Sequence, residues 1–334
     1  MEYCHLTRDE RSQIYALLSN GCSQGEIATQ LNRAPSTISR EIKRNSGGRG
    51  YRPKQAQEKT DERRSLASTT AKKMKGELLE LIEEKLLLDW SPEQISGWLG
   101  ASDILISHES IYLHVWEDKR QGGTLYTHLR HACKKYNKRG SGRAGRGCIP
   151  NRVDIDQRPA VAERKGRLGD WEGDTVIGAM HKGAILTVVD RKSKFSLFVN
   201  LEGKTSEEVN NAIVARFEHL LDEYPRFELG QIARTITFDN GKEFSGHEAI
   251  SEALGADCYF AKPYHSWERG LNEHTNGLLR QYYPKKTDFT DLSDEKTQWI
   301  EDRLNDRPRK VLNYMTPREV FMGKRRPAMV ALRG

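Results

Sequence analysis

Apolar positions in the first 45 residues repeat with helical spacing, and polar residues mark where three short helices begin. The stretches Thr7–Glu10 and Ser23–Glu26 both match a capping box, which starts a helix. Pro35 opens a third segment, whose apolar residues Ile38 and Ile42 lie one turn apart. The other positions of this third segment are polar or basic: Ser36, Thr37, Ser39, Arg40, Lys43 and Arg44. This pattern predicts a helix-turn-helix whose third helix enters the major groove of DNA.

A second copy of this pattern follows further along the chain. Four positions recur at the same relative offsets of 0, +3, +4 and +8. They are Ser23, Glu26, Ile27 and Leu31 in the first copy and Ser91, Gln94, Ile95 and Leu99 in the second. The reading helix of the second copy, residues 107–116, is less basic than that of the first. Two roles therefore stay open for it, DNA contact or packing and dimerisation. Residues 46–73 are expected only to connect the two modules.

From about Arg164 the apolar pattern changes to short strand-like runs joined by turns. Three strands in quick succession are followed by alternating helices and strands, which predicts a mixed five-stranded sheet flanked by helices. The expected strands cover residues 170–179, 184–191, 194–201, 233–240 and 258–261. The expected helices cover residues 205–221, 243–254 and 267–283. We therefore expect four parts: helix-turn-helix modules at 1–60 and 61–129, a basic flexible linker at 130–160 and an α/β domain at 161–334.

The basic charge of the chain is concentrated in one segment. The net charge is +7, and residues 130–152 alone hold eight basic residues and no acidic one. Such a block, interleaved with glycine, predicts a flexible arm that contacts DNA phosphates without reading sequence, through Lys134, Lys135, Lys138 and Arg139. No apolar run approaches the roughly 18 residues of a membrane span, and no apolar signal region opens the chain. We expect a cytoplasmic protein with no membrane partner.

Acidic residues stand in three separate elements of the expected α/β domain. The first strand offers Asp170, Glu172 and Asp174. Alternate residues of a strand share a face, so geometry alone does not choose among these three. Asp239 ends a strand-like run but precedes Asn240-Gly241, so it is either a turn residue or a ligand at a strand end. Converging carboxylates repel one another and need a cation, which predicts Mg²⁺ or Mn²⁺, with two ions about 3.5–4 Å apart.

The last expected helix also offers two acids, Glu268 and Glu273, which point in different directions. Glu273 shares a face with Arg269 and Arg280, and that stripe is a candidate DNA contact. No P-loop or Rossmann fingerprint occurs, so we expect no nucleotide cofactor.

Three blocks resemble the catalytic blocks of bacterial insertion-sequence DDE transposases, in particular the IS-thirty family. They read WEGD, FDNGKEF and ERGLNEHTNGLLRQYYPK, and 33 residues separate Asp239 from Glu273. The N-terminal helices and a C-terminal block, NDRPRKVLNYMTPREVF, fit as well, so the resemblance covers nearly the whole chain. It implies a ribonuclease-H-like integrase core, and it selects Asp174, Asp239 and Glu273 as the catalytic and metal-binding residues.

The resemblance also implies a function. The protein would bind the terminal inverted repeats of an insertion sequence, cleave double-stranded DNA and join the freed ends to target DNA. Joining two ends implies a homo-oligomer of at least two protomers. Two other classes remain open: a metal-dependent DNA endonuclease that does not join ends, and a catalytically inert DNA-binding regulator.

Overall fold

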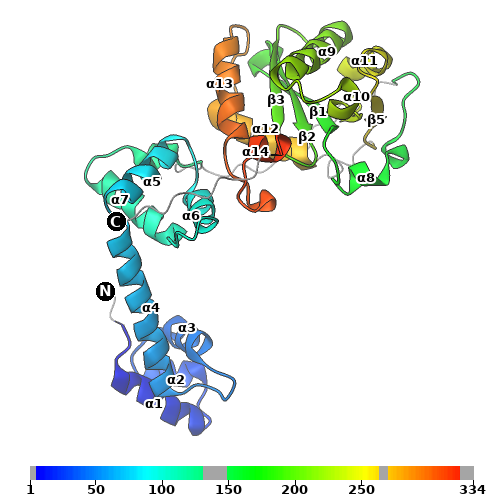
Figure 1. Ribbon diagram of the computed structural model, residues 1–334. Coiled ribbons are helices and arrows are strands. Elements are labelled where there is room, and N and C mark those ends of the chain that lie inside the picture. The colour runs from blue at the N-terminus through cyan, green and yellow to red at the C-terminus, as the bar shows by residue number, and fades with distance from the viewer. Residues whose placement is uncertain (1–4, 131–148, 263–269, 324–334) are drawn as a thin grey trace. The chain divides into compact units, whose positions relative to one another are not determined.

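The computed structural model describes residues 5–130, 149–262 and 270–323 (Figure 1). By compactness the chain divides into two units, Met1–Leu79 and Glu80–Gly334. No helix among the described residues is long and apolar enough to cross a membrane.

The first unit opens with the three helices expected from the capping pattern. They are α1 (Arg8–Ser19), α2 (Gln24–Gln30) and α3 (Pro35–Asn45). Both predicted capping boxes form, with Thr7 and Ser23 as the capping residues. Ile14, Ile27 and Ile38 are fully buried where the helices meet. The helix-turn-helix prediction is therefore confirmed.

A fourth helix, α4 (Pro53–Lys73), replaces what was expected to be only a connecting segment. Pro53 stands in its first turn, where a proline is tolerated, and helix-forming residues dominate the rest. The segment lacks a regular apolar stripe, so periodicity gave no sign of it. Buried Arg11 of α1 donates to Gln57 of α4 at 2.9 Å, and Ala56 is fully buried. Polar contacts, rather than an apolar face, attach α4 to the bundle.

The second unit includes the second helical module. Its helices are α5 (Glu77–Leu87), α6 (Pro92–Gly100) and α7 (His108–Arg120), and Ser91 forms the predicted capping box with Gln94. The Gln94 amide also donates to the Pro308 carbonyl at 2.9 Å, which attaches α6 to the α/β part of the same unit. The domain boundaries given above stay predictions.

A mixed five-stranded sheet forms the centre of the second unit, as expected for a ribonuclease-H-like fold. Its strands are β1 (Asp170–Ile177), β2 (Ala184–Asp190), β3 (Ser196–Leu201), β4 (Thr235–Phe238) and β5 (Asp257–Phe260). The spatial order is β3-β2-β1-β4-β5. Strands β1, β2 and β3 pair antiparallel, whereas β4 runs parallel to both β1 and β5. Parallel strands β1 and β4 therefore bring their C-terminal ends to the same edge.

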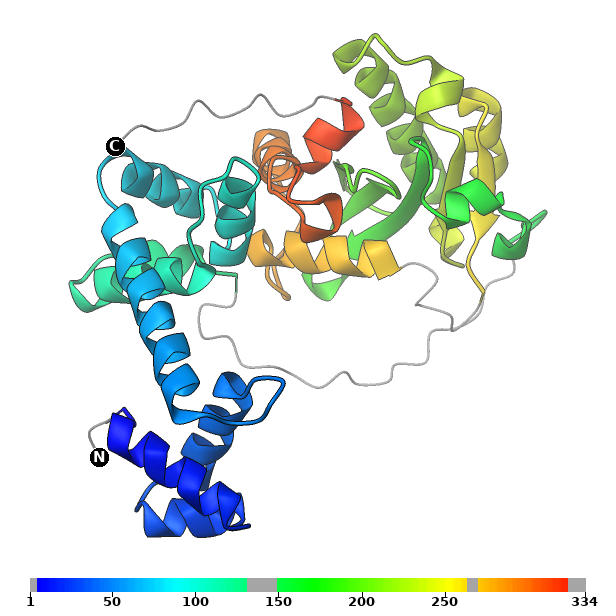
Figure 2. The same ribbon diagram turned by 60° about the horizontal axis from the view of Figure 1, so that its bottom comes forward.

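Helices cover both faces of this sheet (Figures 1 and 2). On one face α9 (Ser206–Glu223) and α11 (His247–Leu254) enclose a core that contains Trp171 and Phe217. On the other face α12 (Gly270–Tyr282) and α13 (Asp294–Asn305) pack on Val176 and Ile185. Because side chains alternate along β1, Asp174 shares the face of Val176 and lies under α12.

The remaining short helices are α8 (Ala160–Glu163), α10 (Leu229–Ile232) and α14 (Pro317–Phe321). In the described part of the chain, 3-10 turns cover Leu125–His128, Ile155–Gln157, Ala179–His181, Lys242–Phe244 and Lys310–Leu312. The helix expected from residue 243 begins only at His247, because the 3-10 turn and Gly246 come first.

Candidate active site

A hydrogen bond connects the first candidate acid to the helix of the third. The Asn276 amide of α12 donates to Asp174 Oδ2 at 2.8 Å. The amide oxygen of Asn276 in turn accepts from the Thr187 hydroxyl of β2 at 3.0 Å. Asn276 is thereby oriented by β1 and β2 together. Glu273 stands three residues before it on α12, so the same contact fixes the helix that carries Glu273.

The second candidate acid, Asp239, follows β4 directly. The parallel register pairs Glu172 with Thr237. Continued by two residues, this register sets Asp239 level with Asp174 on the neighbouring strand, and adjacent strands lie about 4.8 Å apart. Asp239 Oδ1 also accepts from the Gly241 backbone N–H at 2.8 Å. Asp239 thus stands at a strand end and also stabilises the turn that follows, so the two interpretations of this residue are compatible.

The three candidate carboxylates are not assembled into a metal site in this structure. Within residues 5–130, 149–262 and 270–323, no three His, Cys, Asp or Glu side chains group closely enough to hold a metal ion. Asp174 and Asp239 are half-buried, while Glu273 is exposed. Their oxygens are the hard donors that Mg²⁺ and Mn²⁺ prefer, and they come from three elements at one end of the sheet. This donor set fits a divalent ion.

The other two acids of the first strand have partners that give them structural roles. Buried Glu172 forms an ion pair with buried Arg191 and accepts from the Asn272 backbone N–H of α12 at 3.3 Å. Burial lowers the pKa of Arg191. Buried Asp170 pairs with Arg167 at 3.0 Å. Asp174 differs from these two in being half-buried rather than buried, and its choice as the catalytic acid of the first strand stays a prediction.

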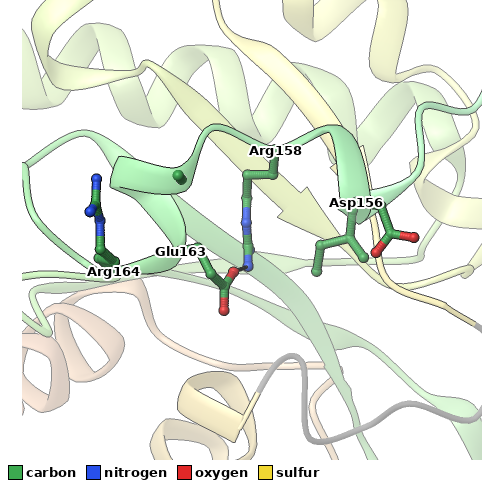
Figure 3. Close-up of a pocket in the computed structure, with 6 residues that line it drawn as sticks. Asp156, Arg158, Glu163 and Arg164 are labelled. Atoms are coloured by element: carbon green, nitrogen blue, oxygen red, sulfur yellow. Dashed lines mark hydrogen bonds and ion pairs between the residues drawn. The ribbon is translucent and has the colours of Figure 1, made fainter.

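Arg191 also lies near Glu163, which lines a separate hollow. This hollow of about 480 Å³ is lined in part by Asp156, Arg158 and Glu163 (Figure 3). Figure 3 shows Arg158 and Glu163 reaching toward each other, and they form an ion pair. Glu163 also lies 3.7 Å from Arg191. A chain of alternating charges therefore runs from Arg158 to Glu172 and ends at the first turn of α12.

One acid near the site has a role that differs from the one expected. Glu243 was interpreted as a helix-start residue, but it lies in the 3-10 turn before α11. It accepts from the Thr175 hydroxyl of β1 at 2.9 Å. A Cβ at Gly241 would lie 2.6 Å from Glu243 Oε2 and 2.8 Å from Asp239 Oδ1, so both carboxylates approach this glycine. The only sequence signal for this role of Glu243 was its position four residues after Asp239 in the block FDNGKEF.

The predicted DNA contacts divide into three groups. On α3, Ser36, Ser39, Arg40, Lys43 and Arg44 are exposed and Thr37 is half-buried. On α12, Arg280 is half-buried and donates to the Ile177 carbonyl at 2.9 Å, so it stabilises the end of β1. The other candidates, Arg269, Lys134, Lys135, Lys138 and Arg139, lie outside the described residues.

Comparison with known proteins identifies the family. A family model described as a helix-turn-helix domain matches residues 2–45. The chain is 44% identical over 323 residues to the transposase for insertion sequence element IS4351 of Bacteroides fragilis, covering 95% of each chain. It is 38% identical to the transposase InsI for element IS30A of Escherichia coli strain K12, covering 95% of this chain and 83% of the relative. The chain belongs to the IS30 (IS-thirty) family of transposases. The predicted family is therefore confirmed.

As a member of this family, the protein is a DNA transposase and a DDE polynucleotidyl transferase. Its helix-turn-helix binds DNA. A third relative, the transposase for element IS1086 of Cupriavidus metallidurans, is 35% identical and covers 96% of this chain and 95% of its own length. Among solved structures, the catalytic core domain of BIV integrase is similar at 19% identity, with a TM-score of 0.33. It covers 46% of this chain and 93% of that chain.

Proposed function

We propose that Asp174, Asp239 and Glu273 are the catalytic residues and hold two Mg²⁺ or Mn²⁺ ions. The observation that carries this proposal is the hydrogen bond from Asn276 to Asp174, because it fixes the Glu273 helix beside the strand end that Asp239 shares. Enzymes of this type generally use divalent metals. When bound, such ions supply Lewis-acid stabilisation of the attacking and leaving oxygens of a phosphodiester.

The residues around the site orient these three acids. The Asn276 amide leaves Asp174 Oδ1 directed away from α12, where it accepts from the neighbouring Thr175 N–H at 3.0 Å. The Gly241 N–H holds Asp239 at the end of β4. We expect the exposed Glu273 side chain, on the first turns of α12, to turn toward the two aspartates when metal binds. These contacts support a role for the three acids as one site.

The proposed substrates are the terminal inverted repeats of an insertion element and a target DNA. The exposed polar face of α3 supports recognition of the repeats, and the segment 130–152 supplies phosphate contacts that do not depend on sequence. Joining two ends requires at least two protomers, so the active form is a homo-oligomer on DNA. The proposed place of action is the bacterial cytoplasm, at the nucleoid.

The test is a set of single variants assayed on labelled element ends, scored separately for nicked and joined product. Asp174→Asn, Asp239→Asn and Glu273→Gln should each abolish cleavage and joining while leaving specific DNA binding unchanged. Glu172→Gln and Asp170→Asn are the matched controls, because both carboxylates already have buried partners. Normal joining by any one of the three variants removes that residue from the site. Nicks without joined product would assign the protein to a hydrolytic nuclease.

A second measurement tests metal coordination itself. Asp174→Cys should be inactive with Mg²⁺ and partly restored by Mn²⁺, because a thiolate is a poor ligand for Mg²⁺ and a better one for the softer ion. Equal inactivity with both ions, together with intact DNA binding, would argue against Asp174 as a metal ligand.

A further inference from the structure

A cavity of about 650 Å³ lies beside the first turns of α12, on a different side of that helix from Glu273. Its walls also come from the turn between β2 and β3 and from the segment after α13. Lys165, Lys194 and Arg309, from three separate segments, are among the four Lys or Arg residues that line it. The cavity is large enough for a phosphate-bearing group, since ligand pockets typically span about 300–1,000 Å³.

The charges lining this cavity do not balance. Four of the lining residues are Lys or Arg, the three already named and Arg191, and two are acidic, Glu163 and Glu172, which leaves a net charge of +2. Both carboxylates are already occupied by Arg191, which pairs with Glu172 and lies 3.7 Å from Glu163. Within the described residues, Lys165, Lys194 and Arg309 form no ion pair with a carboxylate. The excess positive charge therefore faces the cavity.

Lys194 and Arg309 are partly buried and lie near other cations, whereas Lys165 is exposed. Burial, and then the charge of Lys165, lowers the pKa of Lys194 to about 8. Burial, and then the charges of Arg307 and Arg130, lowers the pKa of Arg309 to about 9. Each of the two donates one hydrogen bond to a backbone carbonyl, Lys194 to Arg191 and Arg309 to Leu304, and each keeps further N–H groups for a ligand. Clustered cations with spare donors are suited to an oxyanion.

Both lysines also adopt a backbone conformation that favours glycine. The φ angle is +55° at Lys165 and +65° at Lys194, in the left-handed region. Lys165 ends the short helix α8, and Lys194 lies in the turn between β2 and β3, two places where glycine is the common choice. Strained backbone that carries a charged side chain into a cavity is an indication of function. A positive φ favours glycine, so the backbone conformation does not explain why lysine occupies these two positions.

We propose that this cavity, the lysine cavity, binds a backbone phosphate of a DNA strand that passes the catalytic helix. Lys165 and Lys194 donate to the phosphate oxygens, and Arg309 adds positive charge from the opposite wall. The inference rests on the proposed function, because it assumes that DNA lies along α12. A free phosphate compound has the same chemistry, and the experiment below separates the two sources.

The test compares the full-length wild type with Lys165→Gly/Lys194→Gly and with Lys286→Gly. Lys286 also has a positive φ, of +75°, but it is exposed and does not line the cavity, so it is a matched control for charge and backbone. Binding of a random-sequence duplex is measured over a range of salt concentrations with a chelator present. Binding of inorganic pyrophosphate is measured by calorimetry. Glycine suits a positive φ, so the double variant should melt at or above the wild-type temperature.

The double variant should bind the duplex about tenfold more weakly, as expected when charge-assisted hydrogen bonds are removed. Its salt slope should fall by about 0.9 for each phosphate that the protein no longer neutralises. Lys286→Gly should change affinity less than about twofold, because Lys286 does not line the cavity and an isolated exposed charge contributes little. Unchanged affinity and slope in a folded double variant would overturn the proposal. Loss of pyrophosphate binding with unchanged duplex binding would overturn DNA as the source of the phosphate.

Because no divalent ion is present in these measurements, neither result bears on the catalytic triad. Failure of the triad variants on labelled ends would be a separate finding.

Discussion

The Asn276 side chain of α12 donates a 2.8 Å hydrogen bond to the Asp174 carboxylate of β1, and this contact crosses 102 positions of the chain. It joins the first and third catalytic blocks of the sequence. Thr187 of β2 completes the arrangement by donating to Asn276. Both the nitrogen and the oxygen of the Asn276 amide therefore have a partner. The contact fixes α12 against β1, and Glu273 lies about one turn earlier on that helix.

Asn276→Ala should reduce cleavage and joining by about 10- to 100-fold, the usual effect of removing a residue that orients a metal ligand. The free energy of unfolding should change by only about 1 kcal/mol, because one hydrogen bond is removed. Gln298→Ala on α13 is the control, since it removes an amide that bonds Glu301 and Asp302 away from the site. Full activity of Asn276→Ala at all divalent ion concentrations would show that the contact does not position the site.

Gly173 of β1 packs directly against the Phe238 ring of β4. Gly173 immediately precedes Asp174, and Phe238 immediately precedes Asp239. A Cβ at Gly173 would lie 2.6 Å from the ring. Gly173→Ala should therefore destabilise the fold by about 1–3 kcal/mol through overpacking. It should also lower activity, because the ring must shift the strand end that carries Asp239. Urea unfolding measures the first effect and the joining assay the second.

Two variants test whether overpacking is the cause. Adding Phe238→Leu to Gly173→Ala should recover part of the stability, since the smaller side chain makes room. Gly230→Ala has no atom within 4 Å of its new Cβ and should be neutral or slightly stabilising. A neutral Gly173→Ala variant would contradict the close packing of Gly173 against Phe238.

Glu172 and Arg191 form a buried ion pair, with side-chain exposures of 2% and 3%. Arg191→Ala leaves the Glu172 charge without a cation and should destabilise the protein by about 3–5 kcal/mol. Glu172→Gln should cost less, because Arg191 still has Glu163 at 3.7 Å and the amide oxygen still accepts from Asn272. Joining activity, measured well below the melting temperature, should persist in Glu172→Gln. Its complete loss in a folded variant would make Glu172 a candidate metal ligand again.

Some of this fold was predictable because local signals and tertiary structure agree. The capping boxes at Thr7, Ser23 and Ser91 all form, since they depend only on residues three positions apart. The mixed five-stranded sheet followed from three adjacent strands and then alternating helices and strands. By contrast, α4 has no apolar stripe, and its attachment depends on Arg11 of another helix, which no local pattern reveals.

In the candidate site, too, some features follow from local sequence signals and others depend on tertiary contacts. Sequence spacing selected Glu273 only with the help of a family resemblance, because Glu268 and Glu273 are equivalent to a local pattern. Which acid of the first strand is structural depended on Arg191, 19 residues beyond Glu172, entering the same buried space. The positive φ angles of Lys165 and Lys194 also arise from tertiary structure, since neither residue type favours that conformation. Charged partners distant in sequence are thus the part that pattern analysis misses.

Substitutions in two groups of residues on α3 should affect DNA binding in different ways. Ser36, Thr37 and Arg40 lie toward its N-terminus, the part of a recognition helix that usually meets base edges. Lys43 and Arg44 lie in its last turn, where they are better placed for phosphates. All but Thr37 are exposed, so substitution should not disturb the bundle, in which Ile38 is the buried apolar position of this helix.

Arg40→Ala should cost about 1–3 kcal/mol of specific binding if the guanidinium pairs with a guanine edge, and it should relax preference at a single base position. Lys43→Ala should weaken binding to terminal-repeat and random DNA by equal factors, because a phosphate contact carries no sequence information. Both outcomes are measured by competition between the two DNAs at one fixed salt concentration, since affinity falls steeply with salt. Deleting residues 1–50 should remove the discrimination. A deletion variant that still selects terminal repeats would transfer recognition to the second module, where Ser107 caps the corresponding helix α7.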